Sequence, residues 1–203
     1  MQDILTLIFD KLYSHFGPQH WWPGEGIEIP IGAILTQQTS WNNVEKALAN
    51  LKNHKCLNIS CLQSIPLADL ERLIRPSGYY RQKARTIKSL ISLLSTCSRP
   101  TREQLLQIKG IGPETADSIL LYAFNKPIFV VDAYTFRILN RLGLFNGQNY
   151  KRCQELFMNN LPHDPQLYNE YHALLVKLGK EVCLLKNPRC FICPLIDLCI
   201  YHK

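Results

Sequence analysis

The segment from Leu106 to Asp117 limits the fold of this chain more than any other part of the sequence. Two glycines, Gly110 and Gly112, flank one isoleucine, and glycine can take the positive φ that a tight reversal requires. Pro113 follows, and it suits the first residue of a helix because the N–H that it lacks is not needed there. The pattern predicts a helix-hairpin-helix with free backbone amides at a helix N-terminus, which suits a phosphate group.

Taken alone, the hairpin fits two interpretations equally well. The first is a DNA-binding site that contacts the phosphate backbone and not the bases. Lys109 lies beside the turn and would add positive charge to such a site. The alternative is a glycine-rich connection between two helices that binds no ligand. Asp132, one helix further along, and a run of cysteines near the C-terminus favour the first interpretation.

Four cysteines near the C-terminus have a spacing typical of a metal centre: Cys183, Cys190, Cys193 and Cys199. Thiolates this close in sequence can hold a 4Fe–4S cluster or a tetrahedral zinc ion. Zinc ribbons more often use two Cys-x-x-Cys pairs on a longer loop, so the spacing favours iron–sulfur over zinc. Disulfides fit poorly, because nothing marks the chain as secreted.

The charge and the N-terminal residues limit the class of protein. A formal net charge of +7 favours a polyanionic partner. Asp3, Asp10 and Lys11 interrupt the first apolar residues, so we expect neither a signal peptide nor a membrane span there. A cytoplasmic, nucleoid-associated protein with no membrane partner follows as an expectation. In such a reducing compartment four other cysteines would be ordinary thiols, namely Cys56, Cys61, Cys97 and Cys153.

Apolar residues recur at helical spacing almost throughout the chain, beginning with Ile4, Ile8 and Leu12. The only strand-like alternation is Ile27, Ile29 and Ile31, and Pro30 interrupts it. The predicted fold is therefore all-α. Later helices are expected near residues 115–124, 133–142, 152–160 and 166–178.

The hairpin, Asp132 and the cysteine spacing together resemble the endonuclease III superfamily of helix-hairpin-helix DNA glycosylases. The resemblance covers roughly Gly26 to Cys199. The N-terminal half is most similar to the bacterial 3-methyladenine DNA glycosylases of the endonuclease III type. That second likeness is carried by Trp21, Trp22 and Pro23 and by residues 32–39, 75–84 and 109–112. Because those alkyladenine enzymes lack the cluster, the chain combines features of two groups.

The resemblance implies a two-lobed fold and a DNA partner. Residues 29–125 would form a helical barrel domain with the hairpin. Residues 1–28 and 126–203 would form a terminal domain that carries a 4Fe–4S loop at 183–199. The protein would act as a monomer on double-stranded DNA that contains a damaged base. The hairpin would also hold a monovalent cation through the carbonyls of Leu106, Ile108 and Ile111.

The resemblance further assigns the catalytic positions. In bifunctional members a lysine just after the hairpin attacks the sugar, and Glu114 stands at that position here. A carboxylate cannot form a Schiff base, so a monofunctional enzyme without AP lyase activity is expected. Asp132 would stabilise an oxocarbenium-like sugar and orient the attacking water. The alternative for Asp132 is a helix cap, and the two roles can coexist.

Residues for DNA and base contacts follow from the same alignment. An enzyme that acts on a base within a duplex must flip it out and fill the gap. Gln38 would fill the gap, with Gln37 as a neighbouring option, and Tyr79 would wedge into the opposite strand. The DNA-binding residues expected are Gln37, Gln38, Tyr79, Lys109, Gly110, Gly112 and Thr115.

Three tryptophans are the candidates for base selection. An alkylated purine carries positive charge, and electron-rich rings can select it by cation–π stacking. Trp21 and Trp41 match the aromatic sandwich of the 3-methyladenine enzymes, and Trp22 would shape the pocket wall. The alternative for each tryptophan is a place in the core.

The resulting hypothesis is a base-excision repair glycosylase that hydrolyses the N-glycosidic bond of alkylated purines such as 3-methyladenine. One alternative is a glycosylase or AP lyase for another lesion, such as an oxidised pyrimidine, uracil or a mismatched base. A second is a DNA-structure binder without catalysis, in which Glu114 marks lost chemistry. The absent lysine argues against a lyase, and Asp132 argues against the silent binder.

Overall fold

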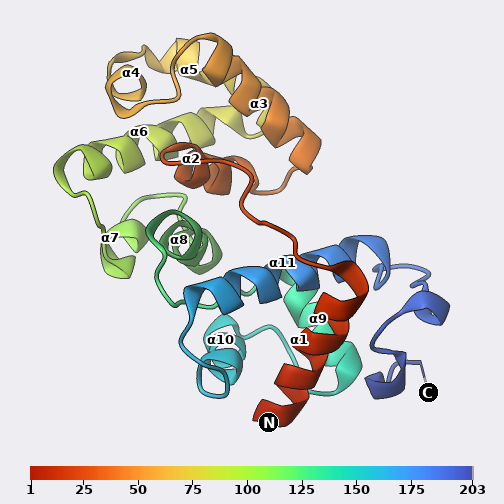
Figure 1. Cartoon of the computed structure of the whole chain (residues 1–203). Coiled ribbons are helices and arrows are strands. Elements are labelled where there is room, and N and C mark those ends of the chain that lie inside the picture. Colours follow the sequence, from red (N-terminus) through yellow and green to blue (C-terminus); the bar gives the residue numbers. More distant parts are fainter. Residues whose placement is uncertain (203) are drawn as a thin grey trace. The chain divides into compact units, whose positions relative to one another are not determined.

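The computed structural model describes residues 1–202, and within that range it contains helices and no β-strand (Figure 1). The predicted all-α fold is therefore confirmed. The chain forms two compact units. The central unit is continuous and comprises residues 24–124, whereas the terminal unit combines residues 1–23 with residues 125–202. None of the helices in the described part of the chain has the length and apolar character that a membrane crossing requires.

The central unit is built around helix α2 (Glu28–Leu35), which is buried from Ile29 to Leu35. Ile29 and Ile31 of the alternating isoleucines lie in this helix, and Ile27 is its N-cap residue. Apolar residues occupy all sides of the helix, as expected of a helix that others enclose. Four elements pack on it: α3 (Trp41–Asn53), α6 (Tyr80–Thr96), α8 (Pro113–Ser118) and the π-helical η2 (Ile119–Ala123). The unit is completed by α4 (Ile59–Ser64), α5 (Leu67–Leu73), the 3-10 turn η1 (Arg75–Ser77) and α7 (Arg102–Leu106).

The terminal unit joins the two ends of the chain. Helix α11 (Pro165–Glu181) packs against both α1 (Gln2–Phe16) and α9 (Ala133–Leu142), as Figure 1 shows. Ile8 and Leu12 of the predicted apolar stripe are buried together with Leu5, whereas Ile4 is half-buried. The Tyr171 hydroxyl of α11 donates to the Leu5 carbonyl at 2.8 Å. The other elements are α10 (Tyr150–Met158) and the 3-10 turns η3 (Cys190–Ile192) and η4 (Ile196–Leu198).

Polar caps explain where several helices begin. Thr101 and Gln104 form a capping box at α7, in which each side chain bonds the backbone of the other residue. Asp132 and Asp164 accept backbone N–H groups at the starts of α9 and α11. The short polar side chains that precede these helices thus satisfy amides that would otherwise lack partners.

The expectation of four ordinary thiols is wrong for two of them. Cys56 and Cys61 form a disulfide, with their Cα atoms 5.0 Å apart, whereas Cys97 and Cys153 are free. Cys56 lies in the short connection between α3 and α4, and Cys61 lies in the first turn of α4, which Asn58 caps. The pairing of Cys56 with Cys61 follows from local geometry and not from the cellular compartment.

Candidate active site

The hairpin lies between α7 and α8 in the central unit. Gly110 has φ +96°, and a Cβ atom there would lie 2.4 Å from the Thr86 hydroxyl oxygen of α6. That hydroxyl donates to the Lys109 carbonyl at 2.9 Å, so only glycine permits this close approach. Gly112 differs from the expectation, since its φ of −94° is open to other residues. Of the two hairpin positions, only the one at Gly110 therefore requires glycine.

An ion pair joins the two helices of the hairpin. Arg102 of α7 donates from Nε to Oδ1 of Asp117 at 2.6 Å and from Nη2 to Oδ2 at 3.1 Å. Asp117 of α8 is fully buried, and a bidentate guanidinium is the partner best suited to a buried carboxylate. Sequence reasoning missed this pair. The sequence neighbours of Asp117 include the polar residues Thr115 and Ser118, so no local pattern marked it as a buried carboxylate.

The residues of the hairpin that were predicted to take part in the site differ in their exposure to solvent. Lys109, Gly110, Gly112 and Glu114 are exposed, whereas Thr115 is buried. Gln37, which follows α2, donates its side-chain N–H groups to the Gly110 carbonyl and to the Thr115 hydroxyl, both at 2.9 Å. Two hydrogen bonds thus hold the Gln37 side chain against the hairpin. The carbonyl of Ile108 accepts the Ile111 N–H at 3.0 Å, and the cation site stays a prediction.

One pocket of the central unit brings together four of the predicted DNA-binding residues. It is lined by Gln37, Gln38, Tyr79, Gln82, Lys83, Thr86 and Gly110. Gln38 and Tyr79 are both exposed and both have left-handed backbones, with φ of 51° and 45°. Sequence reasoning missed Gln82, Lys83 and Thr86. Their spacing of three, four and seven residues after Tyr79, which places them on one helix face, could have indicated them.

Asp132 begins α9 in the terminal unit. Its Oδ1 accepts the backbone N–H of Thr135 at 2.7 Å and the Thr135 hydroxyl at 2.9 Å, so Asp132 does cap the helix. Its Oδ2 lies 3.6 Å from Nε2 of His172 on α11. The side chains of Asp132 and His172 are only 12% and 9% exposed, so solvent screens their interaction weakly. Sequence reasoning missed His172, although a histidine within an apolar helical segment could have indicated it.

The surroundings of Asp132 keep it ionised. Burial alone would raise its pKa, but the electrostatic interaction with the nearby His172 ring, together with the bonds from Thr135, holds the pKa below its usual value. The neighbouring thiol of Cys153 on α10 responds in the opposite direction. Burial and the negative charge of Asp132 raise its pKa to about 12, so this thiol stays protonated. The site therefore holds one buried carboxylate at neutral pH.

The tryptophans belong to different units. The rings of Trp21 and Trp22 lie together in the terminal unit, with centroids 4.9 Å apart and planes inclined by 56°. Trp41 is the first residue of α3 in the central unit. All three side chains are half-buried. The base pocket formed by the three rings stays a prediction.

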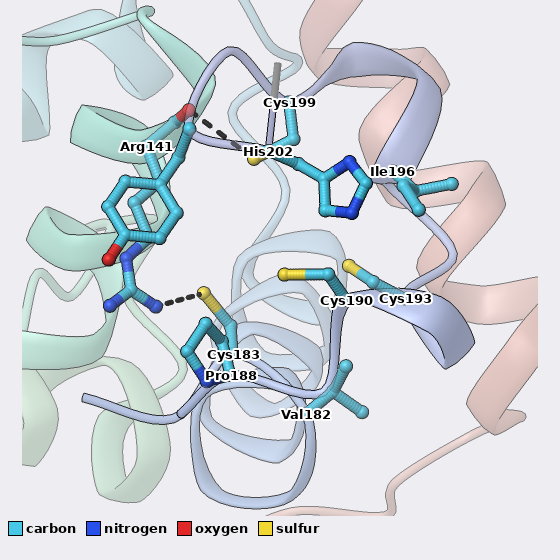
Figure 2. A pocket seen from close by; sticks show the side chains of 10 residues that line it. Arg141, Val182, Cys183, Pro188, Cys190, Cys193, Ile196, Cys199 and His202 are labelled. Carbon is cyan, nitrogen blue, oxygen red and sulfur yellow. Dashed lines mark hydrogen bonds between the residues drawn. The ribbon is translucent and has the colours of Figure 1, made fainter. Parts of the chain in front are cut away.

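The four C-terminal cysteines line one pocket of the terminal unit (Figure 2). Arg141 of α9 donates from Nη1 to the sulfur of Cys183 at 3.1 Å and to the Leu184 carbonyl at 2.8 Å, and the Cys199 thiol donates to the Arg141 carbonyl at 3.4 Å. Among residues 1–202, no three His, Cys, Asp or Glu side chains are arranged to hold a metal ion. The four sulfur atoms therefore share a pocket, and the metal centre stays a prediction.

Comparison with known families gives a match over residues 31–163. The matching family is described as the HhH-GPD superfamily of base excision DNA repair proteins. A candidate DNA repair glycosylase of Methanocaldococcus jannaschii is 40% identical over 98% of this chain and 96% of its own length. Endonuclease III of Thermotoga maritima is 31% identical over 86% of this chain and 83% of its own length.

Solved structures give the same picture. An H. pylori 3-methyladenine DNA glycosylase bound to 1,N6-ethenoadenine has a TM-score of 0.79 and 32% identity. That match covers 89% of this chain and 97% of the H. pylori chain. A non-covalent endonuclease III–DNA complex has a TM-score of 0.87 and 26% identity, over 100% of this chain and 97% of the other.

Proposed function

The chain belongs to the HhH-GPD superfamily and is an endonuclease III-like DNA glycosylase of base excision repair, and on this basis we propose that it is monofunctional and acts on alkylated purines such as 3-methyladenine. The observation that carries the proposal is that the chain has an ionised, buried Asp132 and, at position 114 after the hairpin, a glutamate instead of a lysine. The protein would act as a monomer on double-stranded DNA, flip the damaged base out and leave an abasic site in an intact strand.

Asp132 performs the chemistry in this proposal. Cleavage of the N-glycosidic bond leaves positive charge on the sugar, and an ionised carboxylate stabilises that charge most strongly when it is shielded from solvent. The same carboxylate orients water for attack at the sugar carbon. The bonds from Thr135 to Oδ1 fix the orientation of the Asp132 carboxyl group.

Glu114 is the reason for proposing a monofunctional enzyme. It lies exposed in the first turn of α8, directly after the hairpin. An amine at this position could attack the sugar and form a Schiff base, whereas a carboxylate cannot. Hydrolysis by water assisted by Asp132 is the remaining route.

An alkylated purine is the proposed substrate because its chemistry suits these residues. Its positive charge already weakens the glycosidic bond, so little acid catalysis is needed. The rings of Trp21, Trp22 and Trp41 would select the cationic base by stacking. The likeness to a 3-methyladenine glycosylase from H. pylori supports this choice.

The four cysteines that share a pocket are the proposed ligands of a 4Fe–4S cluster. Their donor chemistry fits, since four thiolates are the usual ligand set of such a cluster and the Arg141 guanidinium donates to one of the sulfur atoms. The cluster would hold the loop at 183–199 in place and supply no chemistry to the base. Lys186 and Arg189 of this loop would then present positive charge to phosphate groups.

A second candidate function is a glycosylase with AP lyase activity on another lesion. The 31% identity with endonuclease III of Thermotoga maritima favours it. Glu114 speaks against it, because the exposed position after the hairpin offers no amine.

Product analysis on a panel of duplexes distinguishes the two. The panel carries methylated purines, hypoxanthine, uracil, oxidised bases or a bare abasic site, and free base and strand breaks are scored separately. We expect release of 3-methyladenine, with strand breaks appearing only after alkali. Breaks without alkali, together with trapping of the protein on DNA by borohydride, would contradict the proposal and favour the lyase. Release of a different base alone would overturn the substrate assignment.

Substitution of His172 by glutamine should shift the pH dependence of base release. Glutamine keeps a hydrogen-bond donor near Asp132 but removes the positive charge that helps to lower its pKa. The Asp132 pKa then rises, so the carboxylate is lost at a higher pH as the solution is acidified. The acidic limb of the single-turnover rate should therefore move to higher pH.

His163 offers the matched control for this substitution. It is exposed in the terminal unit and lies 3.0 Å from the Met158 carbonyl. His163→Gln should leave the acidic limb unchanged. If His172→Gln and His163→Gln give the same pH profile, His172 does not set the charge of Asp132.

A further inference from the structure

Lys83 is a lysine buried within the central unit. It lies on α6, its exposed fraction is 3%, and its Nζ donates to the carbonyls of Leu35 at 2.8 Å and Ser77 at 2.7 Å. Leu35 is the last residue of α2, and Ser77 is the last residue of η1. One amine therefore joins the ends of two segments that are far apart in the sequence.

Each of these two ends lies close in sequence to a residue of the pocket that Gln37, Gln38 and Tyr79 help to line. Gln38 follows Leu35 by three positions, Tyr79 follows Ser77 by two, and Lys83 lines the same pocket as both. Gln38 and Tyr79 have left-handed backbones, which side chains disfavour and which persist only where the surrounding structure holds them. The two bonds from Lys83 therefore hold the backbone three residues before Gln38 and two residues before Tyr79.

The burial of Lys83 has a cost, which is visible in its protonation. Removal from water lowers the pKa of the amine to about 8. An apolar side chain of similar length would fill the same space without this cost, but it could not bond the two carbonyls. The neutral amine keeps two N–H groups, so both bonds can persist when the proton is lost.

We propose that Lys83 is a positioning residue for DNA recognition, which fixes the Leu35–Gln38 and Ser77–Tyr79 segments so that Gln38 and Tyr79 enter the duplex together. The inference rests on the proposed function, because it assumes that these two side chains occupy the gap left by the flipped base. Lys83 itself touches neither the base nor the reacting sugar in this proposal.

Lys88 provides a matched control on the same helix. Its Nζ also donates to two carbonyls, those of Gln63 and Ile65, but it is only half-buried and lies outside the pocket. Lys88→Met and Lys83→Met each remove an amine that joins two carbonyls. A lower unfolding temperature alone therefore cannot distinguish a positioning role from a purely structural one. A change in DNA recognition that only the Lys83 variant shows can distinguish them.

The test uses the whole chain of residues 1–203 and a DNA duplex that can be chosen before the substrate base is known. The probe carries a tetrahydrofuran analogue of an abasic site opposite 2-aminopurine, whose fluorescence reports unstacking of the opposite base. The quantity measured is the ratio of affinities for this probe and for the undamaged duplex. Lys83→Met should lower the ratio by about tenfold and reduce the fluorescence rise, because loss of the two bonds frees both segments. Lys88→Met should leave the ratio within about twofold of wild type.

Double substitutions show whether Lys83 acts through the two side chains. In a Gln38→Ala/Tyr79→Ala background, Lys83→Met should lower the ratio by less than about twofold, since nothing remains to be positioned. A full additional loss in that background overturns the inference, as does a Lys83→Met protein that behaves like Lys88→Met. If Gln38→Ala and Tyr79→Ala leave the ratio unchanged, the proposed DNA-entry role of these side chains fails, and the inference fails with it for that separate reason.

A second pair of variants keeps the test decisive if Lys83→Met does not fold. Lys83→Arg retains the charge, but a planar guanidinium cannot reproduce the geometry of the amine between the two carbonyls. It is compared with Lys88→Arg on the same probe. A selective loss for Lys83→Arg supports the inference, and equal ratios for the two proteins overturn it.

Discussion

Substitution of Asp132 by asparagine is expected to lower the rate of base release by about a thousandfold, within the range that a positioned acid–base group contributes to catalysis. The amide has nearly the same shape as the carboxylate but carries no negative charge to stabilise the sugar cation or to activate water. Asparagine is also a good N-cap residue, so the bond from the Thr135 N–H should persist and α9 should remain intact. Affinity for undamaged and abasic duplexes should stay near that of wild type.

The measurement is single-turnover base release on the substrate that the duplex panel identifies, together with binding to a duplex that contains an abasic analogue. Asp164→Asn is the matched control, because Asp164 caps α11 in the same unit through the N–H of Gln166. That variant should release base at the wild-type rate. Activity of Asp132→Asn equal to that of Asp164→Asn would exclude Asp132 from the mechanism and leave only its role as a cap.

Substitution of Cys193 by serine is expected to remove the proposed cluster and to destabilise the terminal unit. The C-terminal segment that follows α11 has few buried side chains, and Leu185 and Phe191 are exposed by 73% and 83%. A bound inorganic centre would therefore hold this segment in place of a hydrophobic core. Loss of that binding energy should cost at least about 3 kcal/mol, which lowers the unfolding temperature of a chain this size by about 10 °C.

Iron and sulfide content per protein and the unfolding temperature are the quantities to measure. Cys97→Ser is the control, because Cys97 is a free thiol in the central unit and lies outside the cysteine pocket. It should retain about four iron atoms per protein, the content of a 4Fe–4S centre. One zinc ion per protein and no iron would instead establish a zinc site. Equal stability of the two variants, with no metal in either, would rule out any structural metal in this loop.

Much of the fold could be predicted because its cause is local. Apolar spacing and polar caps depend on residues a few positions apart, and the expected helix at 133–142 agrees with α9 (Ala133–Leu142). The disulfide between Cys56 and Cys61 escaped prediction although its partners are close in sequence. It depends on the path of the connection between α3 and α4, which sets the 5.0 Å between the two Cα atoms, and spacing alone does not encode that path.

The candidate site was predicted less completely than the fold. Gln37, Gln38, Tyr79 and Gly110 were expected to bind DNA, and the structure places them around one pocket. The residues that were not predicted interact with partners that are far away in the sequence. His172 stands 40 positions after Asp132, and Lys83 stands 48 positions after Leu35, so only the packed structure shows these partners.

The division of the terminal unit between both ends of the chain has a consequence for its synthesis. Helix α1 leaves the ribosome early, but the Tyr171 hydroxyl that bonds the Leu5 carbonyl lies 166 residues later. The central unit, in contrast, is continuous and can fold as soon as it has emerged. During translation, the apolar face of α1 therefore stays uncovered until its partner helix α11 has been synthesised.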